Sequence, residues 1–182
     1  PVVPQTSSSG EKVLMVANFA NKILAARGEK IFSAASTELG LTITSTTGMT
    51  GSGTITVDST TGFASSGTVQ IESEFFTYTG VTSTTFTGVT RAASSTTAAT
   101  HLFDTVVSPS SWTEIDSSRT SASKYSFERY NFDGNDKIIL VDGANAPVIF
   151  NTSLTAADVS ESSVSGSKFV AAYRNHMFYA GK

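Results

Sequence analysis

The sequence predicts an all-β protein built from antiparallel meanders. Ser and Thr make up about 30% of the 182 residues, well above their share in ordinary globular proteins. This abundance of small hydroxylated residues argues against a protein of long helices. The apolar runs are short and are separated by Gly, Asn, Asp, Ser and Thr. Thr, Phe, Tyr, Val and Ile, which recur in these runs, favour pleated and half-buried backbone.

The first fifty residues predict an extended lead-in followed by three strands. Residues 1–10 are polar and flanked by Pro, which favours extended backbone. Short apolar runs follow, and runs this short with Gly and Asn between them are typical of strands; they span residues 12–17, 22–26 and 30–34.

One alternative for this region is a single helix over residues 11–26. Val13, Val16 and Ala17, with Ala20, fit the apolar stripe of a helix. Asn18 and Asn21 inside the stretch, and the break at Gly28 after it, argue against the helix.

Residues 53–107 predict a small β module. GTITV, GTVQI, EFFTYT and TTFTGV alternate apolar and polar residues, about ten residues apart, with Gly, Ser or Thr in each turn. A loop at 91–101 and a closing strand at 105–107 complete the module. One face of the strands is expected to form its core: Ile55, Val57, Val69, Ile71, Phe76, Tyr78 and Phe86.

Residues 108–182 predict a second set of strands after a polar stretch that contains the only Trp, Trp112. KYSFERYNF, KIILV and APVIF are joined by Asp-Gly turns, which are strong hairpin signals. A polar linker at 160–167 precedes the final runs, 168–173 and 176–180. A four-stranded antiparallel meander of this kind forms one propeller blade or half of a barrel.

These patterns predict a β scaffold in two parts, residues 1–52 and 108–182, with the module of residues 53–107 inserted in a loop, since loop tips tolerate insertions. The chain has no initial Met, and it ends directly after an apolar run. We therefore expect it to be a segment of a longer protein.

Composition argues against several classes of function. Charged residues are 15% of the chain, the net charge is −3, and Lys and Arg form no run, which argues against nucleic-acid binding. Cys is absent, so disulfides, thiolate metal sites and Cys nucleophiles are excluded. No apolar stretch approaches the length of a membrane span.

The candidate metal ligands are better explained as structural residues. His101 and His176 have no Asp or Glu at ligand spacing in the sequence. Asp133, Asn135 and Asp136, with Asp142 nearby, lack the spacing of a calcium loop, and Asp and Asn in tight turns hydrogen-bond to their own backbone. We expect no metal site and no cofactor.

The candidate catalytic residues are equally weak. Glu72 and Glu74 are two apart on one expected strand face, and Glu114, Asp116 and Glu128 are scattered, so solvated strand faces explain them better than a glycosidase pair. Gly51-Ser52-Gly53 has no partner His and is not a nucleophile elbow. Asn151-Thr152-Ser153 matches a glycosylation sequon, which matters only in a secretory context. The sequence therefore predicts a protein that is not an enzyme.

The aromatic side chains leave one binding role open. Five of them could line a carbohydrate-binding face, although such alternation more often builds the core of a sheet; they are Trp112, Tyr125, Phe127, Tyr130 and Phe132.

Two stretches resemble phage proteins. Residues 53–101 resemble a small β repeat of phage structural proteins, with its Gly-Phe turn (Gly62-Phe63), its Tyr-Thr-Gly strand end (Tyr78 to Gly80) and its closure at Phe86–Arg91. The later stretches YNFDGNDKIILVDGANAPVIF and KFVAAYRNHMFYAGK are similar to blade sequences of the tail nozzle (tail tubular) proteins of short-tailed phages.

The resemblance implies a β-propeller subunit in a six-fold ring at the distal tail, through which the genome leaves the virion. The implied partners are copies of the same chain and other tail, adaptor or fibre proteins, with no sequence-specific nucleic-acid binding and no membrane. The alternative is a tail spike or fibre component that binds a host surface glycan.

Overall fold

The computed structural model describes residues 11–120 and 124–182, so the lead-in expected at residues 1–10 lies outside it. The described chain confirms the all-β class: every sheet is antiparallel, and the one helical element is a 3₁₀ turn, Ser162–Val164. The described residues form two compact units, Ala34–Trp112 and the remainder, residues 11–33 with 113–120 and 124–182. The first is called here the inserted unit and the second the sheet-stack unit.

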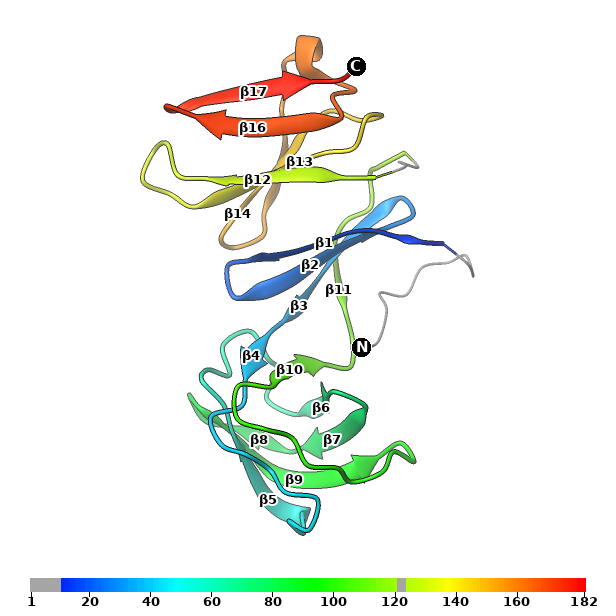
Figure 1. Cartoon of the computed structure of the whole chain (residues 1–182), viewed down its shortest axis with the longest axis vertical. Coiled ribbons are helices and arrows are strands. Elements are labelled where there is room, and N and C mark those ends of the chain that lie inside the picture. The colour runs from blue at the N-terminus through cyan, green and yellow to red at the C-terminus, as the bar shows by residue number, and fades with distance from the viewer. Residues whose placement is uncertain (1–10, 121–123) are drawn as a thin grey trace. The chain divides into compact units, whose positions relative to one another are not determined.

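The first sheet of the sheet-stack unit contains β1 (Val13–Phe19), β2 (Lys22–Arg27), β3 (Lys30–Ala35) and β11 (Thr113–Asp116), in that order (Figure 1). Burial in β1 alternates strictly from Met15 to Phe19, which is the period of a strand with one face in a core. The three strands expected at the start of the chain are confirmed, and the helix over residues 11–26 is wrong. Ala20 and Asn21 both have positive φ, so the backbone reverses in two residues where a helix would have continued.

β11 was not expected, because it lies in the stretch that reads as a polar linker. It pairs with β3, with Thr113 opposite Ser33, although the whole inserted unit lies between the two strands in the sequence. Lys30 Nζ lies 2.6 Å from Glu114 Oε2 across this pair. Its polar residues are tolerated because β11 is an edge strand with little burial.

The second sheet follows chain order, β12 (Ser126–Tyr130), β13 (Lys137–Val141), β14 (Val148–Asn151) and β15 (Ala156–Asp158). The central strand β13 is buried on both faces. Ile138 and Leu140 pack in the core shared with the first sheet, whereas Ile139 and Val141 belong to a separate cluster. Two apolar faces explain why this run reads KIILV without alternation.

The last hairpin, β16 (Phe169–Tyr173) and β17 (His176–Ala180), lies next to the second sheet (Figure 1). Val170, Met177 and Tyr179 pack with Ile139 and Val141 of the sheet beneath. The sheet-stack unit therefore has three β layers, of four, four and two strands.

The inserted unit is one strongly curled sheet of seven strands: β4 (Thr37–Glu38), β5 (Thr50–Thr56), β6 (Gly67–Ile71), β7 (Glu74–Tyr78), β8 (Gly80–Val81), β9 (Thr85–Ala93) and β10 (Val106–Pro109). Its two edges meet where Leu39 bridges Val57, and Gly40 N donates to Thr56 O at 2.9 Å. The seven residues expected to form one face all lie in its core, which confirms that assignment.

Two features of the inserted unit differ from the expected module. It begins at Ala34 and ends at Trp112, so the expected bounds of 53 and 107 fall inside it. The additional residues contribute Leu39, Ile43 and Met49 to the core. β5 pairs with β9 and not with β6, so β5 lies at one edge of the sheet, and the curl brings this edge back toward β4, where Leu39 bridges Val57.

Candidate functional site

A buried group of charged side chains occupies one end of the inserted unit. Glu74 opens β7, and Arg91 lies in the neighbouring strand β9. β9 has a bulge here: Phe75 is opposite Ala93 and Thr77 is opposite Thr90, so Arg91 and Ala92 together face one residue of β7. The bulge allows Arg91 to point inward, where its Nε and Nη2 donate to the two Glu74 oxygens at 2.9 and 2.8 Å.

The same two side chains hold the surrounding loops. Arg91 donates to the carbonyl oxygens of Thr44 (2.7 Å), Thr47 (3.1 Å) and Ala99 (2.7 Å). Glu74 accepts from the backbone N–H groups of Ala92 (3.0 Å) and Ala99 (2.9 Å). The pair therefore satisfies polar groups of two long loops that contain little regular structure of their own.

His101 completes the group from the loop that precedes β10. Its Nε2 lies 2.9 Å from Glu74 Oε2, and its Nδ1 lies 2.8 Å from Glu72 Oε2. The ring therefore lies between the two carboxylates and links Glu72, at the surface, to the buried Glu74.

The environment of Glu74 alters its acidity. Burial on its own raises the pKa of this carboxyl, but the hydrogen bonds from Arg91, Ala99, His101 and Ala92 together outweigh burial and lower the pKa from 4.5 to about 2. Glu74 is thus held as a carboxylate.

Glu74 and His101, at the centre of this group, are closed to solvent, which limits what the group can do. Glu74 is 0% exposed and His101 is 1% exposed, so no substrate reaches them without local opening. The expectation that Glu74 lies on a solvated strand face is wrong, although the Glu72 side chain is 59% exposed. Among the residues that the structure describes, no cluster of His, Cys, Asp or Glu is arranged to hold a metal ion.

The sequence did not indicate this group because His101 is far along the chain from both glutamates. One signal was available: Arg91 is the only Lys or Arg between residues 34 and 112. A single basic side chain in a β module that also contains several carboxylates is a candidate for a buried ion pair.

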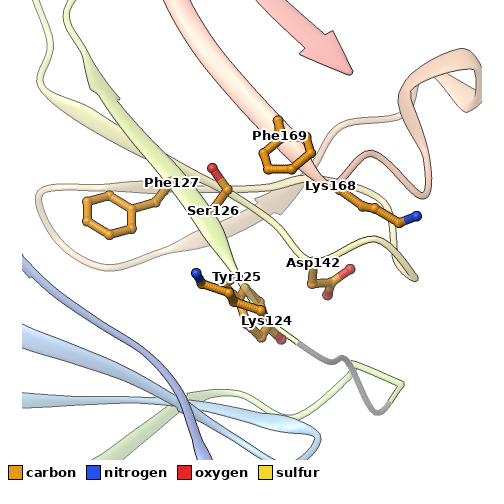
Figure 2. Close-up of a pocket in the computed structure, with 7 residues that line it drawn as sticks. All are labelled: Lys124, Tyr125, Ser126, Phe127, Asp142, Lys168 and Phe169. Carbon is orange, nitrogen blue, oxygen red and sulfur yellow. The ribbon is translucent and has the colours of Figure 1, made fainter. Parts of the chain in front are cut away.

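The sheet-stack unit has an open pocket of about 420 Å³ (Figure 2). Its lining comes from three segments: residues 124–127 at the start of β12, Asp142 after β13, and Lys168 with Phe169 at the start of β16. Figure 2 shows Phe127 extending away from Asp142 and Lys168.

Charge in this pocket is predominantly positive. Asp142 Oδ1 accepts from the N–H groups of Ala144 (2.9 Å) and Asn145 (2.8 Å), and its Oδ2 accepts from Asn145 Nδ2 (2.7 Å). Asp142 is thus engaged in its own turn, as the sequence predicted for turn Asp residues. Lys124 and Lys168 are the remaining charged groups of the lining, and both are exposed.

Asp133 behaves in the same way as Asp142. Its Oδ1 accepts from Asn135 N at 3.2 Å, and its Oδ2 lies 2.6 Å from Lys137 Nζ. Backbone bonding within a tight turn accounts for these residues.

The five aromatic side chains considered for one binding face do not share one. Tyr125 is buried in the core between the first two sheets, and Tyr130 packs on the opposite face of the second sheet, against the hairpin cluster. Tyr130 also contacts Phe132, with ring centroids 4.9 Å apart and the ring planes tilted by 51°. Trp112 belongs to the inserted unit, so only Phe127 lines the pocket together with Tyr125.

A second buried arginine, Arg119, was also missed from the sequence and lies just after β11. Arg119 Nε donates to Asp116 Oδ2 at 2.8 Å, its Nη1 donates to Ala146 O at 2.7 Å, and its Nη2 pairs with Asp158. Burial lowers the pKa of this guanidinium, but its hydrogen bonds with both carboxylates outweigh burial and raise the pKa. This network is structural, because it joins the second sheet to the end of β11.

Comparisons with known proteins leave the family open: no family model, no curated protein and no solved structure matches this chain. Within the described residues, no helix is long and apolar enough to cross a membrane.

Proposed function

We propose that this chain is a structural component of a tailed-phage virion. It would be nozzle-like, located in the tail, without enzymatic activity, and assembled with copies of itself into a ring that forms part of the DNA-ejection conduit. Other tail, adaptor or fibre proteins would be its further partners.

The observation that carries the proposal is the layering of the sheet-stack unit. Successive antiparallel sheets, each with its strands in chain order, pack face to face through β13 and its neighbours. Repeated four-stranded sheets of this kind are the building blocks of propellers. This layering is independent of the resemblance of residues 53–101 to the phage β repeat.

The chemistry of the described side chains is consistent with this role. The two densest charged groups, around Glu74 and Arg119, are buried and hold loops together. An assembly protein needs such rigid units and exposed surfaces for its neighbours.

Electron microscopy of the phage particle that encodes this sequence tests the proposal. We expect density for both units in a six-fold ring at the distal tail. Absence of the chain from the particle, or depolymerase activity of the purified chain, would overturn it.

A second candidate is a spike or fibre component that binds a host glycan, and the pocket of Figure 2 is the observation in its favour. Its two lysines suit a carboxylated or phosphorylated sugar. Binding of host polysaccharide that is lost in Lys124→Ala and retained in the control Lys22→Ala, with trimers at the particle's periphery, would favour this function over the conduit.

A further inference from the structure

The hairpin of β16 and β17 has an uncovered apolar face. Val170 and Tyr179 point toward the sheet beneath, so the alternate residues point outward. Phe169, Tyr173 and Phe178 are 62%, 61% and 56% exposed, respectively. Ala171 pairs directly with Phe178, so the aromatic side chains form one continuous surface, called here the hairpin face. A contiguous apolar surface of this kind marks an interaction site.

The hairpin itself carries positive charge only. Residues 168–182 contain Lys168, Arg174 and Lys182 and no Asp or Glu. The Arg174 guanidinium lies over the Tyr173 ring, 5.3 Å from its centroid. A partner surface that combines apolar side chains with carboxylates would match the hairpin face.

The inserted unit displays such a surface. Leu41, Leu102 and Phe103 are 62%, 65% and 58% exposed. They lie on two segments that run side by side, since Phe103 N donates to Thr42 Oγ1 at 3.0 Å and Ile43 bridges His101. Together they form an apolar patch, called here the loop patch.

Charge on the inserted unit is complementary to that of the hairpin face. Residues 34–112 contain five carboxylates and a single Lys or Arg, which is Arg91. Arg91 is buried and paired with Glu74, so its charge is not presented on the surface. The exposed charged residues of the unit are therefore all acidic: Glu38, Asp58, Glu72 and Asp104. Asp104 directly follows Phe103 of the loop patch.

We propose that the hairpin face of one copy of this chain binds the loop patch of a second copy. Two hairpin faces packed on each other would bring Lys168, Arg174 and Lys182 against their own equivalents, which is unfavourable. The contact is heterologous, so each copy keeps one free face, and repetition produces a closed ring or an open filament. A role for this contact in a DNA conduit rests on the proposed function.

A mixing experiment tests the contact. One variant carries Phe169→Asp and Phe178→Asp in the hairpin face, and the other carries Leu102→Asp and Phe103→Asp in the loop patch. All four positions are exposed, so the fold is expected to persist, which circular dichroism checks. Sedimentation velocity of the wild type is expected to show association that each variant alone loses by at least tenfold in affinity.

The mixture decides between modes of association. Each variant keeps one intact face, so equal amounts of the two are expected to form a one-to-one heterodimer. Monomers alone in the mixture, or wild-type association unchanged in either variant, would overturn the proposal. Val16→Asp, at a 59% exposed apolar residue outside both faces, is the matched control and should associate like the wild type.

The charge contribution has its own test. Arg174→Glu and Asp104→Arg are each expected to weaken association, and mixing the two variants should recover part of it. If the solution tests fail but the chain is found in a tail ring, only the proposed interface is contradicted and the proposed function stands. If the chain associates as proposed but is absent from the virion, the contact stands and only the proposed function is contradicted.

Discussion

Replacing Glu74 with Gln tests how much the inserted unit depends on its buried charges. Gln has the size of Glu but carries no charge, and its amide group presents N–H donors where the carboxylate now accepts five hydrogen bonds. Arg91 would remain buried with carbonyl partners and without its counter-charge. We therefore expect a large loss of stability confined to residues 34–112.

The expected magnitude follows from the burial of both partners. The side chains of Glu74 and Arg91 are 0% and 6% exposed, and breaking such a pair costs about 3–5 kcal/mol. In a domain of this size, 1 kcal/mol shifts the melting temperature by about 4–8 °C, so the unit is expected to melt at least about 12 °C lower.

Trp112, the sole Trp, belongs to the inserted unit, so its fluorescence during heating reports on that unit. The matched control is Glu72→Gln, because Glu72 contacts the same His101 ring at 2.8 Å but its side chain is 59% exposed. The control is expected to lose about 1 kcal/mol or less. Equal shifts in the two variants would refute the argument that burial determines the contribution of these carboxylates.

Three further outcomes are expected. Because the pKa of Glu74 is lowered, the stability that this carboxylate contributes is complete above pH 4.5 and is lost as the pH falls from 4.5 toward 2. Melting followed by Trp fluorescence across this pH range should show a steeper decline of the melting temperature for the wild type than for Glu74→Gln. Gly88→Ala should destabilise the inserted unit by about 1–2 kcal/mol or more, since Gly88 has φ +63° and an added Cβ would lie 1.9 Å from Thr79 Oγ1. Urea unfolding measures this loss, and the control Gly48→Ala should be neutral because the space around Gly48 is open. Phe150→Ala should cost about 3–5 kcal/mol by circular dichroism, since Phe150 is fully buried in the core between the first two sheets, and the exposed Val16→Ala should change little.

Local patterns in the sequence predict most of the strands. β6, β13 and β17 begin and end at the expected residues, because short apolar runs and the turn residues that flank them are encoded within a few neighbouring residues. The face from Ile55 to Phe86 is predicted for the same reason, since a period of two fixes which side chains point inward.

Pairings between distant segments are not predicted. β11 has too few apolar residues to be recognised, and its partner β3 supplies the hydrogen bonds that make it a strand. The curl that brings Leu39 to Val57 is similarly invisible in either segment alone.

The candidate sites divide in the same way. The turn roles of Asp133 and Asp142 are local and could be predicted, whereas the joining of Glu74, Arg91 and His101 depends on a bulge in β9 and on the bridge between Ile43 and His101. Such a group has no sequence spacing that identifies it.

The sequence by itself determined the all-β class, most strand positions and the core face of the inserted unit, because these follow from short-range periodicity and turn chemistry. Only the tertiary structure decided which strands share a sheet, that Glu74 is buried and ionised, and that Phe169 and Phe103 remain uncovered. Those properties depend on which distant residues come together and on how much water they exclude, and no local pattern records either.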